Sequence, residues 1–147
     1  MKKIIATLAV IFSLTTSATY AYDGSSVSTA VLKSFSKEFA GARNASWEAV
    51  SDGLYKVTFN YETKDVQAFF DENGNIIATG SRISEEQLPL LVSKSLKSKY
   101  EGFNKNEIIE FSMSGDTQYL VTVSDGKKTE VLKISNQGEI SVYKKLK

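Results

Sequence analysis

Hydrophobic and polar residues alternate along most of residues 45–143, in segments of strand length. The clearest segment runs from Tyr55 to Tyr61, where apolar residues at odd positions are separated by Lys56, Thr58 and Asn60. A period of two is typical of a strand that buries one face. Turn residues such as Asp52-Gly53 separate these segments. The pattern predicts eight strands, at residues 45–50, 55–61, 66–70, 76–80, 108–113, 118–123, 129–134 and 139–143.

Two other segments carry apolar residues at helical spacing, one before each group of four predicted strands. The first, residues 31–41, continues a stripe of Val27, Val31, Leu32, Phe35 and Phe39, and Ser25 or Ser26 is its expected cap. The second, residues 85–102, begins with the capping-box sequence Ser84-Glu85-Glu86-Gln87. Its stripe consists of Leu88, Leu91, Val92, Leu96 and Tyr100.

The chain repeats this pattern about 64 positions later. Residues 55–59 correspond to 119–123, residues 71–76 correspond to 135–140, and Trp47 corresponds to Phe111. A repeat of this length is typically a supersecondary unit that packs against its twin. We therefore expect an α+β fold with two tandem helix-plus-four-stranded-meander repeats, about 25–80 and 84–147. They would form one antiparallel sheet with both helices packed on one face.

Residues 1–21 have the pattern of a signal peptide. Lys2 and Lys3 precede an apolar run at 4–14, and Thr19-Tyr20-Ala21 offers a cleavage site. The run is shorter than the roughly 20 residues that span a bilayer, although an uncleaved N-terminal anchor is the alternative. The sequence predicts a single domain at 22–147, periplasmic or secreted, with no membrane span after cleavage. There are no cysteines, which excludes disulfides and a lipid-modified cysteine.

Composition argues against several classes of function. Without Lys2 and Lys3 the chain has 16 basic and 17 acidic residues, so no electrostatic argument favours nucleic acid or an anionic membrane. The chain has neither histidine nor cysteine, and these supply the commonest general base and the best nucleophile. Ser93 to Lys97 is interpreted as a solvated helix face, and Asp71 to Gly74 as a turn rather than a calcium loop. We expect no enzymatic activity, no cofactor and no metal.

Several motifs together resemble those of the PepSY-like family of exported proteins, which are described as β-lactamase-inhibitor-like. These motifs are Phe35-x3-Phe39, Trp47, Tyr55-x-Val57-x-Phe59, Phe70-Asp71-x2-Gly74 and Leu88-Pro89. The resemblance covers essentially all of residues 22–147 and rests on the order and spacing of loose motifs. It implies a fold similar to that of the secreted β-lactamase inhibitor protein, whose concave sheet clamps the enzyme while a hairpin loop enters the active site.

The resemblance does not extend to every feature of that inhibitor. The inhibitor contains disulfides, and this chain has no cysteine. None of the inhibitor's enzyme-contacting residues is transferred to this sequence. PepSY modules are associated with the regulation of secreted peptidases, so the resemblance also implies a peptidase as a partner.

The second face of the predicted sheet is the main candidate surface. Residues that alternate with the inward positions should lie there: Lys56, Thr58, Asn60, Gln67, Phe69, Leu120, Thr122, Val131 and Lys133. Phe69, Leu120 and Val131 are apolar where a solvated face favours polar residues, which indicates a partner surface. A register slip of one residue would exchange the two faces.

The hairpin tips at residues 62–65 and 125–128 are the second candidate surface, with Asp65 and Asp125 as the residues that would enter a partner. The expected function is that of an exported, non-enzymatic module that binds a protein of the cell envelope. It would act as a steric inhibitor or regulator of a periplasmic or secreted hydrolase of peptidase or β-lactamase type. Binding of a small ligand or envelope component on the second sheet face is the alternative. Pairing of edge strands into a homodimer is left open.

Overall fold

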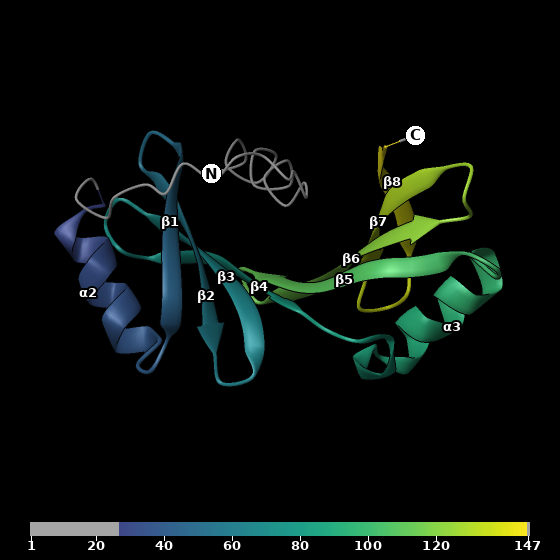
Figure 1. The fold of residues 1–147 in the computed structure, drawn as a ribbon, viewed down its shortest axis with the longest axis horizontal. Coiled ribbons are helices and arrows are strands. Elements are labelled where there is room, and N and C mark those ends of the chain that lie inside the picture. The colour runs from purple at the N-terminus through teal and green to yellow at the C-terminus, as the bar shows by residue number, and fades with distance from the viewer. Residues whose placement is uncertain (1–26, 147) are drawn as a thin grey trace.

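The computed structural model describes residues 27–146, so the predicted signal peptide and its cleavage site lie outside the described residues. A helix and four strands are followed by a short 3₁₀ helix, a second helix and four more strands (Figure 1). The helices are α2 (Thr29–Glu38), η2 (Glu85–Gln87) and α3 (Leu90–Lys99). The first four strands are β1 (Arg43–Ser51), β2 (Leu54–Tyr61), β3 (Lys64–Asp71) and β4 (Ile76–Arg82). The last four are β5 (Asn104–Met113), β6 (Asp116–Ser124), β7 (Thr129–Ser135) and β8 (Ile140–Lys145).

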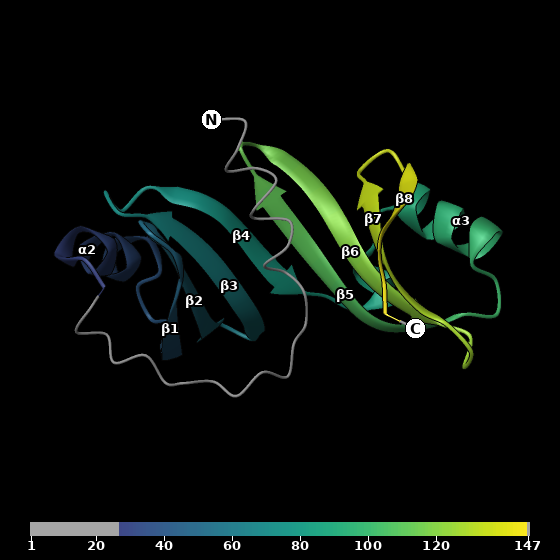
Figure 2. The ribbon, with the colours of Figure 1, turned by 90° about the horizontal axis from the view of Figure 1, so that it is seen from above.

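The strands form one antiparallel sheet in which each strand pairs with its neighbours in sequence, from β1 to β8. The sheet is twisted and elongated, with α2 near one end and α3 near the other (Figures 1 and 2). Only the β4–β5 pairing joins the two groups of four strands within the sheet. The predicted α+β class and the single antiparallel sheet are confirmed.

Both helices pack on the same face of the sheet. Ala68, which contacts α2, pairs with Thr79, and Thr79 pairs with Ser112 on β5. Ile108 lies four residues from Ser112 and therefore on the same side of β5, and it belongs to the core beneath α3. The opposite face, to which the described residues contribute no helix, is called the helix-free face below.

The two helices begin at different kinds of cap. Helix α2 begins after Ser28, whose Oγ accepts a hydrogen bond from the Val31 amide (3.2 Å) and donates one to the Glu72 carbonyl (2.9 Å). The expected cap at Ser25 or Ser26 is therefore wrong. The predicted capping box is present, because the Gln87 side chain accepts from the Ser84 amide at 2.9 Å. However, it begins η2, and α3 starts only after Pro89.

Two separate cores lie between the helices and the sheet. The core beneath α2 is aromatic: Phe35 lies 5.2 Å from Trp47 and 5.0 Å from Phe59 between ring centroids, both edge to face. The core beneath α3 is mainly aliphatic and includes the fully buried Val121 and Leu132. Each helix thus covers its own group of strands, and neither reaches the middle of the sheet (Figure 1).

Candidate functional site

The helix-free face is formed by side chains that alternate with the two cores. On β2 and β3, Lys56 pairs with Phe69 and Thr58 with Gln67, whereas Val57 pairs with Ala68 in the α2 core. The same alternation holds on the second group of strands. Leu120 pairs with Lys133 and Thr122 with Val131, while Val121 pairs with Leu132 in the α3 core. The predicted strand phase is therefore confirmed, and the candidate residues of the sheet lie on one face.

An apolar cluster occupies the middle of this face and bridges β4 and β5. Its buried members are Leu54, Phe69, Ala78, Ile109 and Phe111. Partly buried residues pack against it: Val50, Ile77, Met113 and Leu120. This set is called the central cluster below. Because it lies opposite the helices and between the two cores, it joins the two ends of the molecule on the face that the helices do not cover.

Three candidate residues are less exposed than the sequence suggested. Phe69 has an exposed fraction of 0%, because it packs within the central cluster beside Leu54 and Phe111. Val131 and Thr122 each have an exposed fraction of 8%. The expectation that Phe69 and Val131 are exposed apolar side chains is therefore wrong. Leu120 is partly buried and remains accessible at the border of the cluster.

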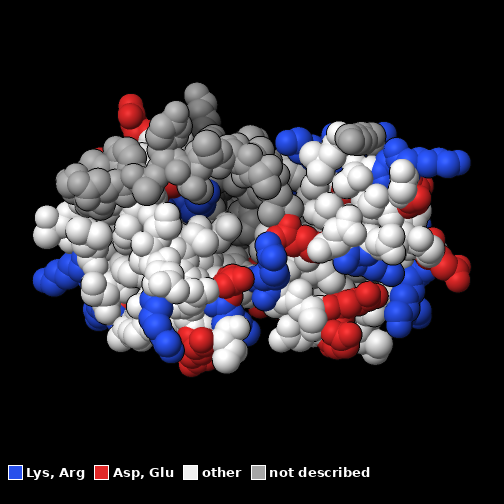
Figure 3. Space-filling view, viewed as in Figure 1, with Lys and Arg blue, Asp and Glu red and all other residues white. Residues whose placement is uncertain are grey.

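Polar and charged pairs surround the central cluster. Lys56 forms an ion pair with Glu48 on β1, and Arg82 forms one with Glu107 on β5. Asn60 accepts a hydrogen bond from Asn44 at 2.8 Å. Figure 3 shows charges of both signs lying side by side over the middle of the molecule. An apolar centre with a polar rim is the usual anatomy of a protein interface.

The two hairpin-tip carboxylates are held by their own chain and do not form one surface. Asp65 accepts from the Asn60 side chain at 2.6 Å. Asp125 accepts from the Lys127 and Lys128 amides, each at 2.9 Å. The hydrogen bonds from the Lys128 and Lys127 amides hold the pKa of the Asp125 carboxyl below its ordinary value. Figure 1 places the β2–β3 turn near the middle of the molecule and the β6–β7 turn at its α3 end.

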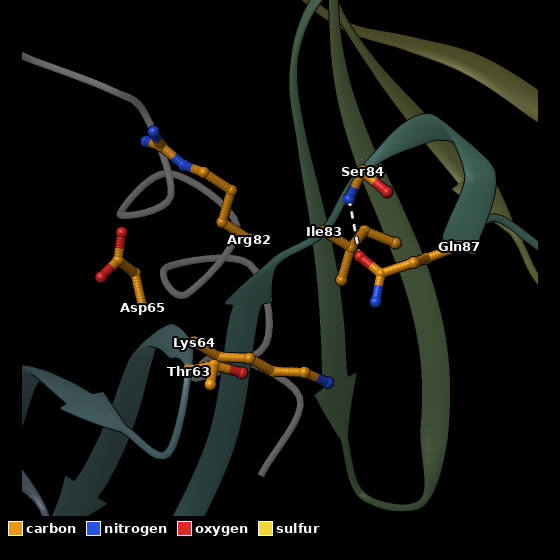
Figure 4. Close-up of a pocket in the computed structure, with 7 residues that line it drawn as sticks. All are labelled: Thr63, Lys64, Asp65, Arg82, Ile83, Ser84 and Gln87. Atoms are coloured by element: carbon orange, nitrogen blue, oxygen red, sulfur yellow. Dashed lines mark hydrogen bonds between the residues drawn. The ribbon is translucent and has the colours of Figure 1, made fainter.

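Asp65 also lines a groove where the first group of strands meets the connection to α3. The groove has a volume of about 410 Å³ and is lined by Thr63, Lys64, Asp65, Arg82, Ile83, Ser84 and Gln87. The Arg82 and Lys64 side chains extend in different directions, and Gln87 bonds back to Ser84 (Figure 4). The polar groups therefore do not converge on a single ligand position.

Most of the central cluster was not predicted, and one of its members was assigned wrongly. Phe111 was matched to Trp47, but Trp47 pairs with Val57 in the α2 core, whereas Phe111 pairs with Gln118 on the helix-free face. On β5 it is Ile108, paired with Val121, that faces the core beneath α3. Between these pairs the β5–β6 hairpin is three residues longer than the β1–β2 hairpin. An alignment of the two halves with one constant offset of 64 residues cannot include that difference in length.

The described residues contain no cluster of side chains suited to binding a metal ion. Within residues 27–146, no group of three or more acidic side chains is arranged to hold one, and the chain has no histidine or cysteine. Partial burial opposes ionisation of Asp71, but hydrogen bonds from the Asn75 side chain and from the Asn75, Asn73 and Gly74 amides outweigh it. They keep the Asp71 pKa below its ordinary value. The carboxylate thus stabilises its own turn.

No helix in residues 27–146 is long and apolar enough to cross a bilayer.

Comparison with known proteins identifies the fold. No family model and no curated protein matches the chain. A BLIP-like protein from Bacteroides fragilis is 23% identical with a TM-score of 0.69, over 81% of this chain and 86% of that one. A DUF2874 family protein from Bacteroides ovatus is 17% identical with a TM-score of 0.70, over 78% and 86%. A structure described as a candidate periplasmic protein from Bacteroides eggerthii is 11% identical with a TM-score of 0.71, over 76% and 84%.

At these identities the comparisons show a shared fold and nothing further about function. The resemblance to the PepSY-like family remains a prediction. The chain is similar in fold to a BLIP-like protein.

Proposed function

We propose that this chain is an exported, non-enzymatic module that binds a protein of the cell envelope through its helix-free face. The observation that carries the proposal is the accessible part of the central cluster, opposite both helices and near paired charges. It consists of the partly buried residues Val50, Ile77, Met113 and Leu120. Bound protein would be held by burial of apolar surface, with hydrogen bonds from half-buried polar residues such as Thr58 and Gln67. The fold shared with a BLIP-like protein supports a binding role by analogy.

The partner that fits this proposal is a periplasmic or secreted hydrolase of peptidase or β-lactamase type. The module would cover the entrance of an active site and block it sterically, without chemistry of its own. Because the hairpin-tip carboxylates of Asp65 and Asp125 are already hydrogen-bonded within the chain, the sheet face carries more of the proposal than the tips. Export by a cleaved signal at residues 1–21 would bring the module to such a target.

We also propose that the two halves are tandem copies of one unit. Gly74 and Gly138 have the same backbone conformation (φ +85° in each), and each lies against the first turn of the helix that precedes its strands. Ala30 and Leu91 supply the contacting carbonyl oxygens. This shared contact supports duplication independently of the sequence match.

Affinity capture with matched variants tests the proposal. The exported chain with a C-terminal tag is compared with Leu120→Lys on the helix-free face and with Leu90→Lys on α3, where Leu90 is 82% exposed. Both variants make the same chemical change, and urea unfolding establishes which variants are folded. A protein retained by the parent and by Leu90→Lys, but lost by folded Leu120→Lys, supports the proposal. Titrating the parent against the hydrolytic activity of that protein then tests inhibition.

The same experiment can reject the proposal. Equal retention by folded Leu120→Lys and by the parent would place the contact on another surface. Retention of hydrophobic small molecules, with no protein captured by any variant, would favour the alternative of a small-ligand or envelope-component carrier.

A further inference from the structure

Two lysines border the apolar residues at the α3 end of the helix-free face. Lys133 on β7 pairs directly with Leu120 on β6, and Lys144 on β8 pairs with Val131 on β7. Directly paired residues in an antiparallel sheet have their Cβ atoms about 5 Å apart. Each ammonium group can therefore lie beside an aliphatic side chain on the same surface.

These lysines differ from Lys56 and Arg82, two other cations of the face. Lys56 is paired with Glu48, and Arg82 is paired with Glu107. Within residues 27–146, neither Lys133 nor Lys144 takes part in an ion pair. Among these residues, Lys56 and Arg82 are thus neutralised by carboxylates of the chain, whereas the two lysines around Leu120 are not.

Within residues 27–146, no carboxylate forms an ion pair with either of these two lysines. Glu107 on β5 is the acidic residue whose strand position is nearest to the two lysines, because it pairs with Thr122, two residues after Leu120 on β6. Its carboxylate already forms an ion pair with Arg82. Glu130 on β7 belongs to the other side of that strand, is only 5% exposed and lies 3.8 Å from the Lys128 ammonium. Lys133 is half-buried, as is typical of a lysine whose aliphatic stem packs on apolar surface while its ammonium group reaches solvent.

We infer that this end of the helix-free face binds a protein segment in which a carboxylate side chain lies next to an apolar side chain. The inference rests on the proposed function and specifies the partner that fits it. The apolar side chain would extend the central cluster over Leu120, and the carboxylate would bind Lys133, with Lys144 contributing a second positive charge. Complementary charge beside a buried apolar contact selects the partner and fixes its register.

A set of disulfide-closed hairpin peptides provides the probe. Each peptide presents two residues at its tip: Trp-Asp, Trp-Asn, Trp-Lys or Gly-Asp. Binding to the exported chain is measured from amide chemical-shift changes during titration at low ionic strength. The expected order places Trp-Asp first by about fivefold over Trp-Asn, with Trp-Lys weakest, as for charge pairs that are partly exposed. Gly-Asp should bind more weakly than Trp-Asp, since a carboxylate alone lacks the apolar contact.

Charge reversal makes the test decisive. In the Lys133→Glu/Lys144→Glu variant, the preference should invert so that Trp-Lys binds more tightly than Trp-Asp. The matched control is Lys33→Glu/Lys37→Glu on α2, which changes net charge equally and should leave the order unchanged. The inference is overturned if the parent does not discriminate among the three tryptophan peptides, or if the α2 control inverts the order as well.

The capture experiment distinguishes failure of the proposed function from failure of this inference. A captured envelope protein that needs Leu120 but is retained equally by the Lys133→Glu/Lys144→Glu variant would uphold the proposed function and reject this inference. Loss of that protein from the lysine variant, with retention by the α2 control, would support both.

Discussion

Gly138 should be far less tolerant of a methyl group than Gly126, although both glycines have nearly the same backbone conformation. Their φ angles are +85° and +86°, a region that non-glycine residues enter at a cost of roughly 1–2 kcal/mol. A Cβ at Gly126 would meet nothing within 4 Å. At Gly138 it would lie 2.7 Å from the Leu91 carbonyl oxygen and 2.6 Å from the Ser95 Oγ. Ser95 can rotate, but the Leu91 carbonyl belongs to the α3 backbone.

The magnitudes follow from these contacts. Replacing glycine by alanine also lowers the conformational entropy of the unfolded chain, which stabilises either variant by about 0.4–1 kcal/mol and offsets part of the backbone strain. Gly126→Ala should therefore destabilise by about 1 kcal/mol or less. Overpacking against a fixed backbone adds about 1–3 kcal/mol, so Gly138→Ala should destabilise by about 2–4 kcal/mol. Urea unfolding followed by circular dichroism measures both. Equal destabilisation of the two variants would refute the claim that the β7–β8 turn is packed against α3.

Three further variants test individual parts of the structure. Ser28→Ala should destabilise by about 1 kcal/mol in urea unfolding, because it removes the α2 cap and the bond to the Glu72 carbonyl; no change would contradict the assigned cap. Asp71→Asn should weaken the acid sensitivity of stability. The lowered Asp71 pKa stabilises the fold above the ordinary value of 3.8, and that contribution is lost as pH falls through the folded-state value, so an unchanged pH profile of the urea midpoint would refute it. Phe69→Ala should destabilise by about 3–5 kcal/mol, as a buried phenylalanine does, whereas a loss below about 1 kcal/mol would show that the side chain is not part of a packed cluster.

The strand faces could be predicted because alternation is a local property of the sequence. Each apolar position between Tyr55 and Tyr61 faces α2, and the intervening Lys56, Thr58 and Asn60 face the other way. The helix stripes were recognised only in part: Val31 and Phe35 pack in the α2 core, and Val92 and Leu96 in the α3 core. The predicted stripe members Leu32 and Leu91 are instead exposed. Cap positions were less accurate, because several serines precede α2 and only the folded structure shows that Ser28 bonds the Val31 amide and the Glu72 carbonyl.

The central cluster could not be predicted, because it depends on the pairing of β4 with β5. Ala78 is next to Met113 only in the folded sheet, and these residues are far apart in the chain. A polar environment was expected for Phe69, yet Phe111 and Ile109 reach the same side through that pairing. The β5–β6 hairpin is also longer than the β1–β2 hairpin, so a fixed offset of 64 matched Trp47 to Phe111, which lies on the opposite face of the sheet. The residue pattern thus predicts which side chains of a strand share a face of the sheet. It does not predict which residues of β4 and β5 become neighbours in the middle of the sheet.

Site-specific photocrosslinking in living cells would test the binding role of the helix-free face most directly. A benzophenone amino acid is placed at Gln67, half-buried on that face, and in a matched strain at Lys94, which is exposed on α3. The account predicts a discrete adduct with an envelope protein at position 67 and none at position 94. Adducts at position 94 alone, or at neither position while the chain is folded and exported, would contradict it.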